Sequence, residues 1–157
     1  MSLDELLLQK LAKWRPDSDR GILTVKDAAG GWSAAVTAEC VDVVGCRLWD
    51  LSLCRSAETP AVDLKERAEQ ICQRATGLME PLRLVEMDRL HHTALLRSEQ
   101  PGQLGEERFY YEVLLEGSES ATIRRYQTPN QDEPRRRQVA FTLTHEALAK
   151  LVRDLIQ

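Results

Sequence analysis

The chain has 157 residues, of which 43% are hydrophobic and 29% charged, and its formal net charge is −4. This length and composition suit one ordinary globular domain. The acidic balance argues against a dedicated nucleic-acid binder, whose domain would be strongly basic. No apolar run approaches the roughly 20 residues that span a bilayer. Asp4 and Glu5 stand where a signal peptide carries lysine or arginine. We therefore expect a single domain over residues 1–157 that is cytoplasmic and has no membrane partner.

The four cysteines, at positions 40, 46, 54 and 72, form no C-x-x-C pair. They lack the spacing of a structural zinc site, and reduced thiols in a cytosolic protein are expected. Cys40 continues the apolar alternation of a strand and Cys72 lies on an apolar helix face, which predicts that both are core residues. Cys46 and Cys54 each precede an arginine, a neighbour that can lower a thiol pKa. The frequent burial of free cysteine favours packing for them as well.

The first part of the chain predicts one helix followed by three strands. Apolar residues with helical spacing run from Leu3 to Trp14. Ser2 and Glu5 have the spacing of a capping box, and Pro16 is expected to end the helix. The strands are expected over residues 21–26, 32–44 and 47–55. In the last of these, alternation places Trp49, Leu51 and Leu53 on one face. Short connections favour an antiparallel arrangement of the three strands.

A second helix follows a linker from Ser56 to Pro60. Asp63 is the expected N-cap, the apolar stripe continues to Leu78, and Gly77 is the expected left-handed terminator. Pro60 marks the best place for a domain boundary, but neither side of it has an obvious core of its own. We therefore keep the prediction of one domain.

The last third of the chain carries the clearest periodicity. Polar and apolar residues alternate through three strand-like runs over 108–116, 121–127 and 137–143. Two earlier strands are expected over 82–87 and 92–97, with a loop over 99–107. Thr144 then caps a final amphipathic helix that reaches Leu155. The predicted fold class is α+β, with the order α-βββ-α-βββββ-α and helices packed on a mainly antiparallel sheet.

Residues that could carry catalysis or bind a metal are sparse. His91 and His92 are adjacent, so they point to opposite faces in a strand and form at most a weak ligand pair in a turn. His145 has no partner at ligand spacing, and we expect no metal and no cofactor. The chain contains no nucleophile elbow, P-loop or dinucleotide fingerprint. Asp50 and Ser52 are most simply the polar side of a strand.

Arginines are the strongest feature outside the predicted core. The candidate ligand-binding residues flank a polar loop and are Arg124, Arg125, Tyr126, Arg135, Arg136 and Arg137. If the strands on either side pair as a hairpin, these guanidinium groups converge and suit phosphate, carboxylate or an acidic protein surface. The alternative is that the positive charges protect an exposed strand edge from aggregation.

In size and predicted element order the chain resembles the dimeric secretion chaperones, which follow an α-βββ-α-ββ-α order. The resemblance covers most of the chain in outline, includes no residue motif, and leaves this chain with extra strands. It implies binding of a partner's extended segment without catalysis.

We predict a non-enzymatic binding or adaptor protein. The alternatives are a chaperone-like protein that binds an extended segment, and an enzyme or small-ligand binder. Tyr110 and Leu114 lie on the strand face opposite the predicted core. Since three helices cannot cover both sides of an eight-stranded sheet, these residues predict a homodimer interface. The alternative is a sheet that curls and packs on itself.

Overall fold

The computed structural model describes residues 1–56 and 63–157 and has the predicted α+β class. Most of the predicted linker, Pro60 included, lies outside the described residues. The elements in chain order are α1 (Leu3–Leu11), β1 (Gly21–Lys26), β2 (Trp32–Val41), β3 (Gly45–Arg55), α2 (Leu64–Arg74), β4 (Leu82–Asp88), β5 (Thr93–Ser98), β6 (Gly102–Leu104), β7 (Glu107–Glu116), β8 (Ser120–Gln127), β9 (Arg137–Val139), β10 (Phe141–Thr144) and α3 (His145–Ile156).

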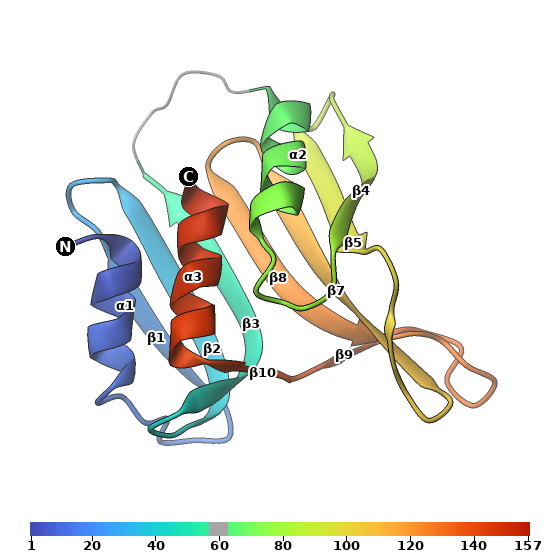
Figure 1. Ribbon diagram of the computed structural model, residues 1–157, viewed down its shortest axis with the longest axis horizontal. Helices are drawn as coiled ribbons and strands as arrows, with labels where there is room; N and C mark the ends of the chain where they lie inside the picture. Colours follow the sequence, from blue (N-terminus) through green and yellow to red (C-terminus); the bar gives the residue numbers. More distant parts are fainter. Residues whose placement is uncertain (57–62) are drawn as a thin grey trace.

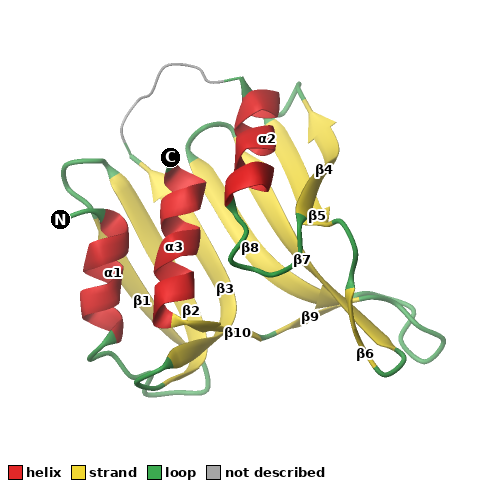
Figure 2. Ribbon diagram, in the orientation of Figure 1, coloured by secondary structure: helices red, strands yellow, loops and turns green. Residues whose placement is uncertain are grey.

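The strands of the described residues form one ten-stranded antiparallel sheet. Its main path runs β1-β2-β3-β8-β7-β5-β4, and three short strands extend it: β10 pairs with β3, β9 with β8 and β6 with β7. One edge of β3 pairs with two strands: residues Leu51–Cys54 pair with β8, and residues Gly45–Leu48 pair with β10. Helices α1, α3 and α2 lie side by side on the same face of the sheet (Figures 1 and 2). We call the opposite face the open face.

The core lies between these helices and the sheet. Each helix contributes leucine or isoleucine side chains that are fully buried, and alternate residues of the central strands meet them. The fully buried large side chains include Leu3, Leu7, Leu11, Leu48, Leu51, Leu53, Ile71, Leu96, Leu115, Ile123, Leu148 and Leu151. Two of the predicted N-caps form as expected: Asp63 accepts a hydrogen bond from the Lys65 amide, and Thr144 accepts one from the Ala147 amide.

Two β-bulges overturn the predicted alternation in β2 and β3. The pairing steps from Thr37↔Asp50 to Ala38↔Leu48 and then to Cys40↔Arg47, so Trp49 and Glu39 are the extra residues. Trp49 was expected on the same face as Leu51, yet it is only half-buried while Leu48 and Leu51 are fully buried. Each bulge moves the following side chain to the other face, which a strict period of two cannot anticipate.

Two cysteine predictions are wrong, and the bulge in β2 explains the first of them. Cys40 follows Glu39 and is exposed, although it was expected in the core. Cys54 is exposed as well, because it lies at the end of β3 on the open face. Cys46 is buried as predicted, and Cys72 is half-buried beside the core. All four thiols are free.

The last strands and the helix ends differ from the predictions in detail. The predicted loop over 99–107 contains β6, which pairs with the start of β7. The predicted strand over 137–143 is divided at Ala140, since its first half pairs with β8 and its second half with β3. Helix α2 ends at Arg74, and Met79, with a φ of 62°, takes the left-handed conformation predicted for Gly77.

Helix α1 is three residues shorter than predicted. The Lys13 amide donates to the Lys10 carbonyl three residues back, which tightens the last turn, and the chain leaves the helix before Pro16. Trp14 therefore lies beyond the helix, half-buried against the core.

The environments of the four thiols predict two reactivity classes. Burial, with a further contribution from Asp42, raises the pKa of the Cys46 thiol to about 11, and burial followed by Glu69 also raises the pKa of Cys72. We therefore expect Cys40 and Cys54 to react with iodoacetamide at about pH 8 well before Cys46 and Cys72. Mass mapping of briefly labelled native protein checks this, with unfolded protein as the control in which all four react. Early modification of Cys46 would contradict the burial.

Candidate functional site

The structure divides the predicted arginine site between the two faces of the sheet. The expected hairpin exists, because β8 pairs with β9 from Arg125↔Val139 to Gln127↔Arg137. Neighbouring residues on a strand point to opposite faces, so Arg124 and Tyr126 lie on the open face and Arg125 lies on the helix face. Arg135 is exposed, and Arg137 donates to the side-chain oxygen of Gln127 at 2.7 Å.

Arg136 joins a compact group that we call the open-face cluster. Its members are Arg97, Tyr110, Glu112, Tyr126 and Arg136. The Arg136 guanidinium lies 3.9 Å from the centroid of the Tyr126 ring and donates to Glu112 Oε2 at 2.6 Å and to the Tyr110 hydroxyl at 3.3 Å. Arg97 Nε donates to the same Glu112 oxygen at 3.0 Å. The two tyrosine rings stack, with centroids 5.8 Å apart.

Carboxylates offset part of the positive charge in and beside the cluster. Arg97 and Arg136 share one carboxylate, and Arg124, which lies directly across from Glu112, has Asp50 at 3.8 Å. Partial burial lowers the pKa of Arg136, but its hydrogen bonds to Tyr110 and Glu112 outweigh this effect and raise the pKa above its ordinary value. Arg136 therefore stays charged at neutral pH. The cluster suits charge pairing and stacking rather than proton transfer.

Arg125 occupies a separate environment on the helix face. Its Nη2 donates to Glu80 Oε2 at 2.9 Å, and its guanidinium lies 4.2 Å from the centroid of the Tyr111 ring. It also lines a cavity of about 490 Å³ whose other walls include Arg47, Leu104 and Phe109. Because this arginine is neutralised and stacked within the fold, it supports the end of the sheet rather than the open-face cluster.

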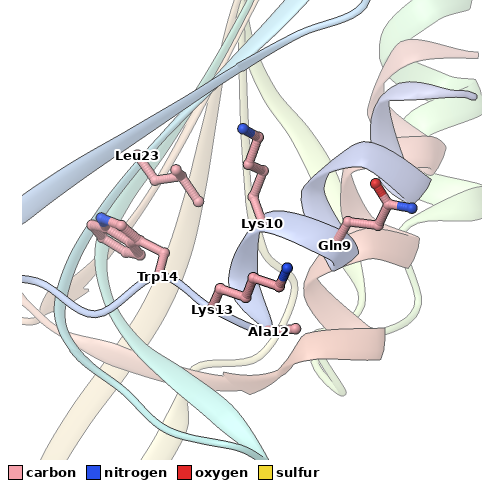
Figure 3. Close-up of a pocket in the computed structure, with 6 residues that line it drawn as sticks. All are labelled: Gln9, Lys10, Ala12, Lys13, Trp14 and Leu23. Atoms are coloured by element: carbon pink, nitrogen blue, oxygen red, sulfur yellow. The ribbon is translucent and has the colours of Figure 1, made fainter.

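Sequence reasoning missed a groove at the other end of the molecule. This groove of about 780 Å³ lies between the end of α1 and the edge strand β1, and it is lined by Gln9, Lys10, Ala12, Lys13, Trp14 and Leu23. In Figure 3, Leu23 and Trp14 lie on one side, and Lys10, Lys13 and Gln9 follow the helix on the other. The groove thus has an apolar wall and a basic wall. Its lining includes no histidine, cysteine or carboxylate.

Strand β1 borders this groove and has a free edge. Its register with β2 is continuous from Gly21↔Ala38 to Lys26↔Ser33, and among the described strands β2 is its only partner. The Asp27 amide donates to the Trp32 carbonyl at 2.8 Å, which fixes the hydrogen-bonded positions of the pair. In an antiparallel ladder these positions alternate. The backbone N–H and C=O groups of Ile22, Thr24 and Lys26 therefore point away from β2.

Two sequence signals bear on this groove. Trp14 lies two residues before the helix-ending Pro16, and Leu23 shares one face of a short strand with Val25. Neither signal reveals that α1 packs over β1 and β2, a long-range contact that creates the groove.

The histidines do not add a site. His91 and His92 both lie in the turn between β4 and β5, where His91 Nδ1 is 2.7 Å from Asp88 Oδ2. His145 begins α3 and is buried. Over residues 1–56 and 63–157, no three His, Cys, Asp or Glu side chains come together in a group that could hold a metal ion.

Glu112 is expected to stabilise the fold because two guanidinium groups depend on it. Glu112→Ala should lower the free energy of unfolding by about 1–3 kcal/mol, since it leaves Arg97 and Arg136 facing each other without a shared acceptor. Glu112→Gln, which retains a carbonyl oxygen, should lower the free energy of unfolding by less. Urea unfolding of the three proteins measures both effects. A loss below about 0.5 kcal/mol for the alanine variant would show that the ion pairs are energetically neutral surface contacts.

Comparison of the chain with protein-family models, curated proteins and solved structures gives no match. None of the helices in the described part of the chain has the length and apolar character needed to cross a membrane. The basis for assigning a function is therefore the geometry of two surfaces: the open-face cluster, and the groove beside the free edge of β1.

Proposed function

We propose that the chain is a non-enzymatic binding protein that takes up an extended segment of a partner protein as an added strand on β1. The observation that carries this proposal is the regular, unpaired edge of β1, with the outward backbone groups of Ile22, Thr24 and Lys26. Such an edge is a template for strand addition. Backbone hydrogen bonds supply the affinity in this mode, and pockets for alternate side chains supply the specificity.

The groove provides such a pocket on the helix side of β1. An added strand lies about 4.8 Å from β1, so its helix-side residues enter the space between Leu23 and the end of α1. Trp14 and Leu23 offer apolar contact there. On the open side, Ile22 is 66% exposed and offers a second apolar contact to the alternate residues of the segment.

The opposite edge of the sheet is less suited to strand addition. The pairing of β4 with β5 shifts between Leu84 and Glu86, which places a bulge in the edge strand. The charged side chains of Arg83 and Glu86 are exposed beside it. A bulge disrupts the ladder and protects a sheet edge from pairing, and β1, which carries the charged Lys26, has no bulge. The contrast between a protected β4 and a regular β1 favours β1 as the binding edge.

A sheet that the described helices cover on one side only and that has a free edge strand is compatible with binding of an extended segment. We propose a cytoplasmic location, in agreement with the free thiols.

Thr24→Pro tests strand addition directly. It removes the outward-facing amide at the centre of β1 and spares the amides that bond to β2. Linear peptides selected on the wild-type chain from a random phage library should bind the proline variant at least about tenfold more weakly, because the central backbone bond is lost. Fluorescence anisotropy of the labelled peptides gives the affinities.

Thr24→Val is the matched control, because it keeps the amide and the β-branched shape while removing the hydroxyl. It should bind the selected peptides as the wild type does, and circular dichroism should show that both variants are folded. Equal affinity of the wild type and the proline variant would overturn strand addition at β1.

We also propose that the chain self-associates through the open face. The helices of the described residues lie on the other face (Figure 2). Leu95 and Leu114 lie opposite each other on neighbouring strands, half-buried, with Tyr110 nearby in the open-face cluster. A two-fold partner would cover these side chains. Tyr110 and Leu114 then lie in the dimer interface, and the edge of β1 remains available to another protein.

Sedimentation equilibrium at micromolar concentration tests self-association. The wild type should sediment as a dimer, and Leu114→Glu should give the 17.8 kDa monomer because it places a charge in the interface. Leu90→Glu, at a residue that is 85% exposed in the β4–β5 turn, is the control and should remain dimeric. A wild-type chain that sediments as a monomer would contradict the dimer.

A further inference from the structure

We infer that the segment bound at β1 is acidic, with aspartate or glutamate alternating with apolar residues. This inference rests on the proposed strand addition and names the chemical class of the partner segment. It is drawn from the distribution of unpaired positive charge around β1, which is independent of the backbone geometry that supports strand addition.

Three lysines surround the free edge without an ion-pair partner in the described residues. Lys10 and Lys13 lie at the end of α1 along the groove, and Lys26 lies on β1 itself. All three are exposed, and no carboxylate of residues 1–56 or 63–157 lies within ion-pair distance of them.

Four arginines on or beside the central strands do have carboxylate partners. Arg97 and Arg136 meet Glu112, Arg124 meets Asp50, and Arg125 meets Glu80. The chain as a whole carries a net charge of −4. The groove side of the β1 edge therefore carries positive charge that no lining carboxylate of the described residues offsets, while Asp27 follows Lys26 at the end of the strand. Complementary charge is the main source of specificity at an exposed surface.

The lysines can form ion pairs with side chains on both faces of an added strand. Lys10 and Lys13 are three residues apart at the end of α1, so they border the helix-side positions of the segment. Lys26 lies on the open side with Ile22 and Thr24, so it borders the other set of positions. A carboxylate on either side of the segment therefore finds an ammonium group, and apolar residues find Trp14, Leu23 or Ile22.

The same charges disfavour a second copy of the chain as the occupant of this edge. Two-fold pairing of β1 with its own copy would bring the α1 ends and their lysines from both molecules to one seam. Like charges in apposition weaken such an interface. The occupant that fits is an acidic segment of a different protein, and this leaves self-association to the open face.

The experiment compares two fluorescein-labelled peptides that alternate valine with a charged residue, glutamate in one and lysine in the other. At low ionic strength the wild-type chain should bind the glutamate peptide about five- to tenfold more tightly, as two or three exposed ion pairs would produce. Added salt should reduce the difference in affinity between the two peptides, because it screens the ion pairs. The double variant Lys10→Glu/Lys13→Glu should reverse the preference.

The control is Lys65→Glu/Arg89→Glu, which makes the same change in net charge at exposed positions on α2 and in the β4–β5 turn. It should keep the preference for glutamate. If the wild type binds the two peptides with equal affinity and Thr24→Pro binds neither, the acidic specificity is overturned. Strand addition at β1 is then still supported. Binding of neither peptide at about 1 mM, or a glutamate preference that survives both Thr24→Pro and the Lys10/Lys13 reversal, would overturn both proposals.

Discussion

The packing of all three helices against one face of a single sheet is the constraint on which the rest of the structure depends. Leucines from α1 and α3 and Ile71 from α2 fill the layer between helices and strands, and the central strands contribute every second side chain to it. Because one face buries the apolar residues, the opposite face must be compatible with water in the single chain. The serines, threonines and arginines that alternate with the core residues follow from this requirement.

That requirement also explains the character of the open-face cluster. Guanidinium groups stacked on Tyr110 and Tyr126 cover aromatic surface while their edges remain hydrated, and Glu112 prevents repulsion between the two arginines. The network is thus a way to hold aromatic rings on an exposed sheet. Among the described residues, the groove beside β1 is lined by Lys10 and Lys13 and by no carboxylate. The ion pairs of the open-face cluster stabilise the fold and leave Tyr110 for the proposed contact with a second copy, whereas the basic groove beside unpaired backbone groups is suited to recognising another protein.

Local sequence patterns were sufficient for the fold class and for most elements. Asp63 and Thr144 cap their helices because a cap depends only on residues within one turn, and the strands of the last third follow their period of two. The bulges at Glu39 and Trp49, the division of the last strand at Ala140 and the pairing of β6 depend on strands distant in sequence, so a local pattern could not reveal them. The opposite orientations of Arg124 and Arg125 did follow from the alternation, but the predicted convergence of the arginines neglected it. The groove escaped prediction because it requires α1 to lie over a strand edge.

The double partnership of β3 has a consequence for how the chain folds. Residues 45–48 pair with β10, near the end of the chain, and α3 follows at once to pack against α1 at its beginning. Contacts between such distant segments carry a large loop-closure cost, which slows folding. During synthesis the leucines of α1 and the first three strands emerge long before α3 can cover them. The β3–β10 pairing and the α1–α3 contact cannot form until residues 141–156 leave the ribosome, and in that interval the apolar side chains of the N-terminal half are open to aggregation or to binding by the cell's folding machinery.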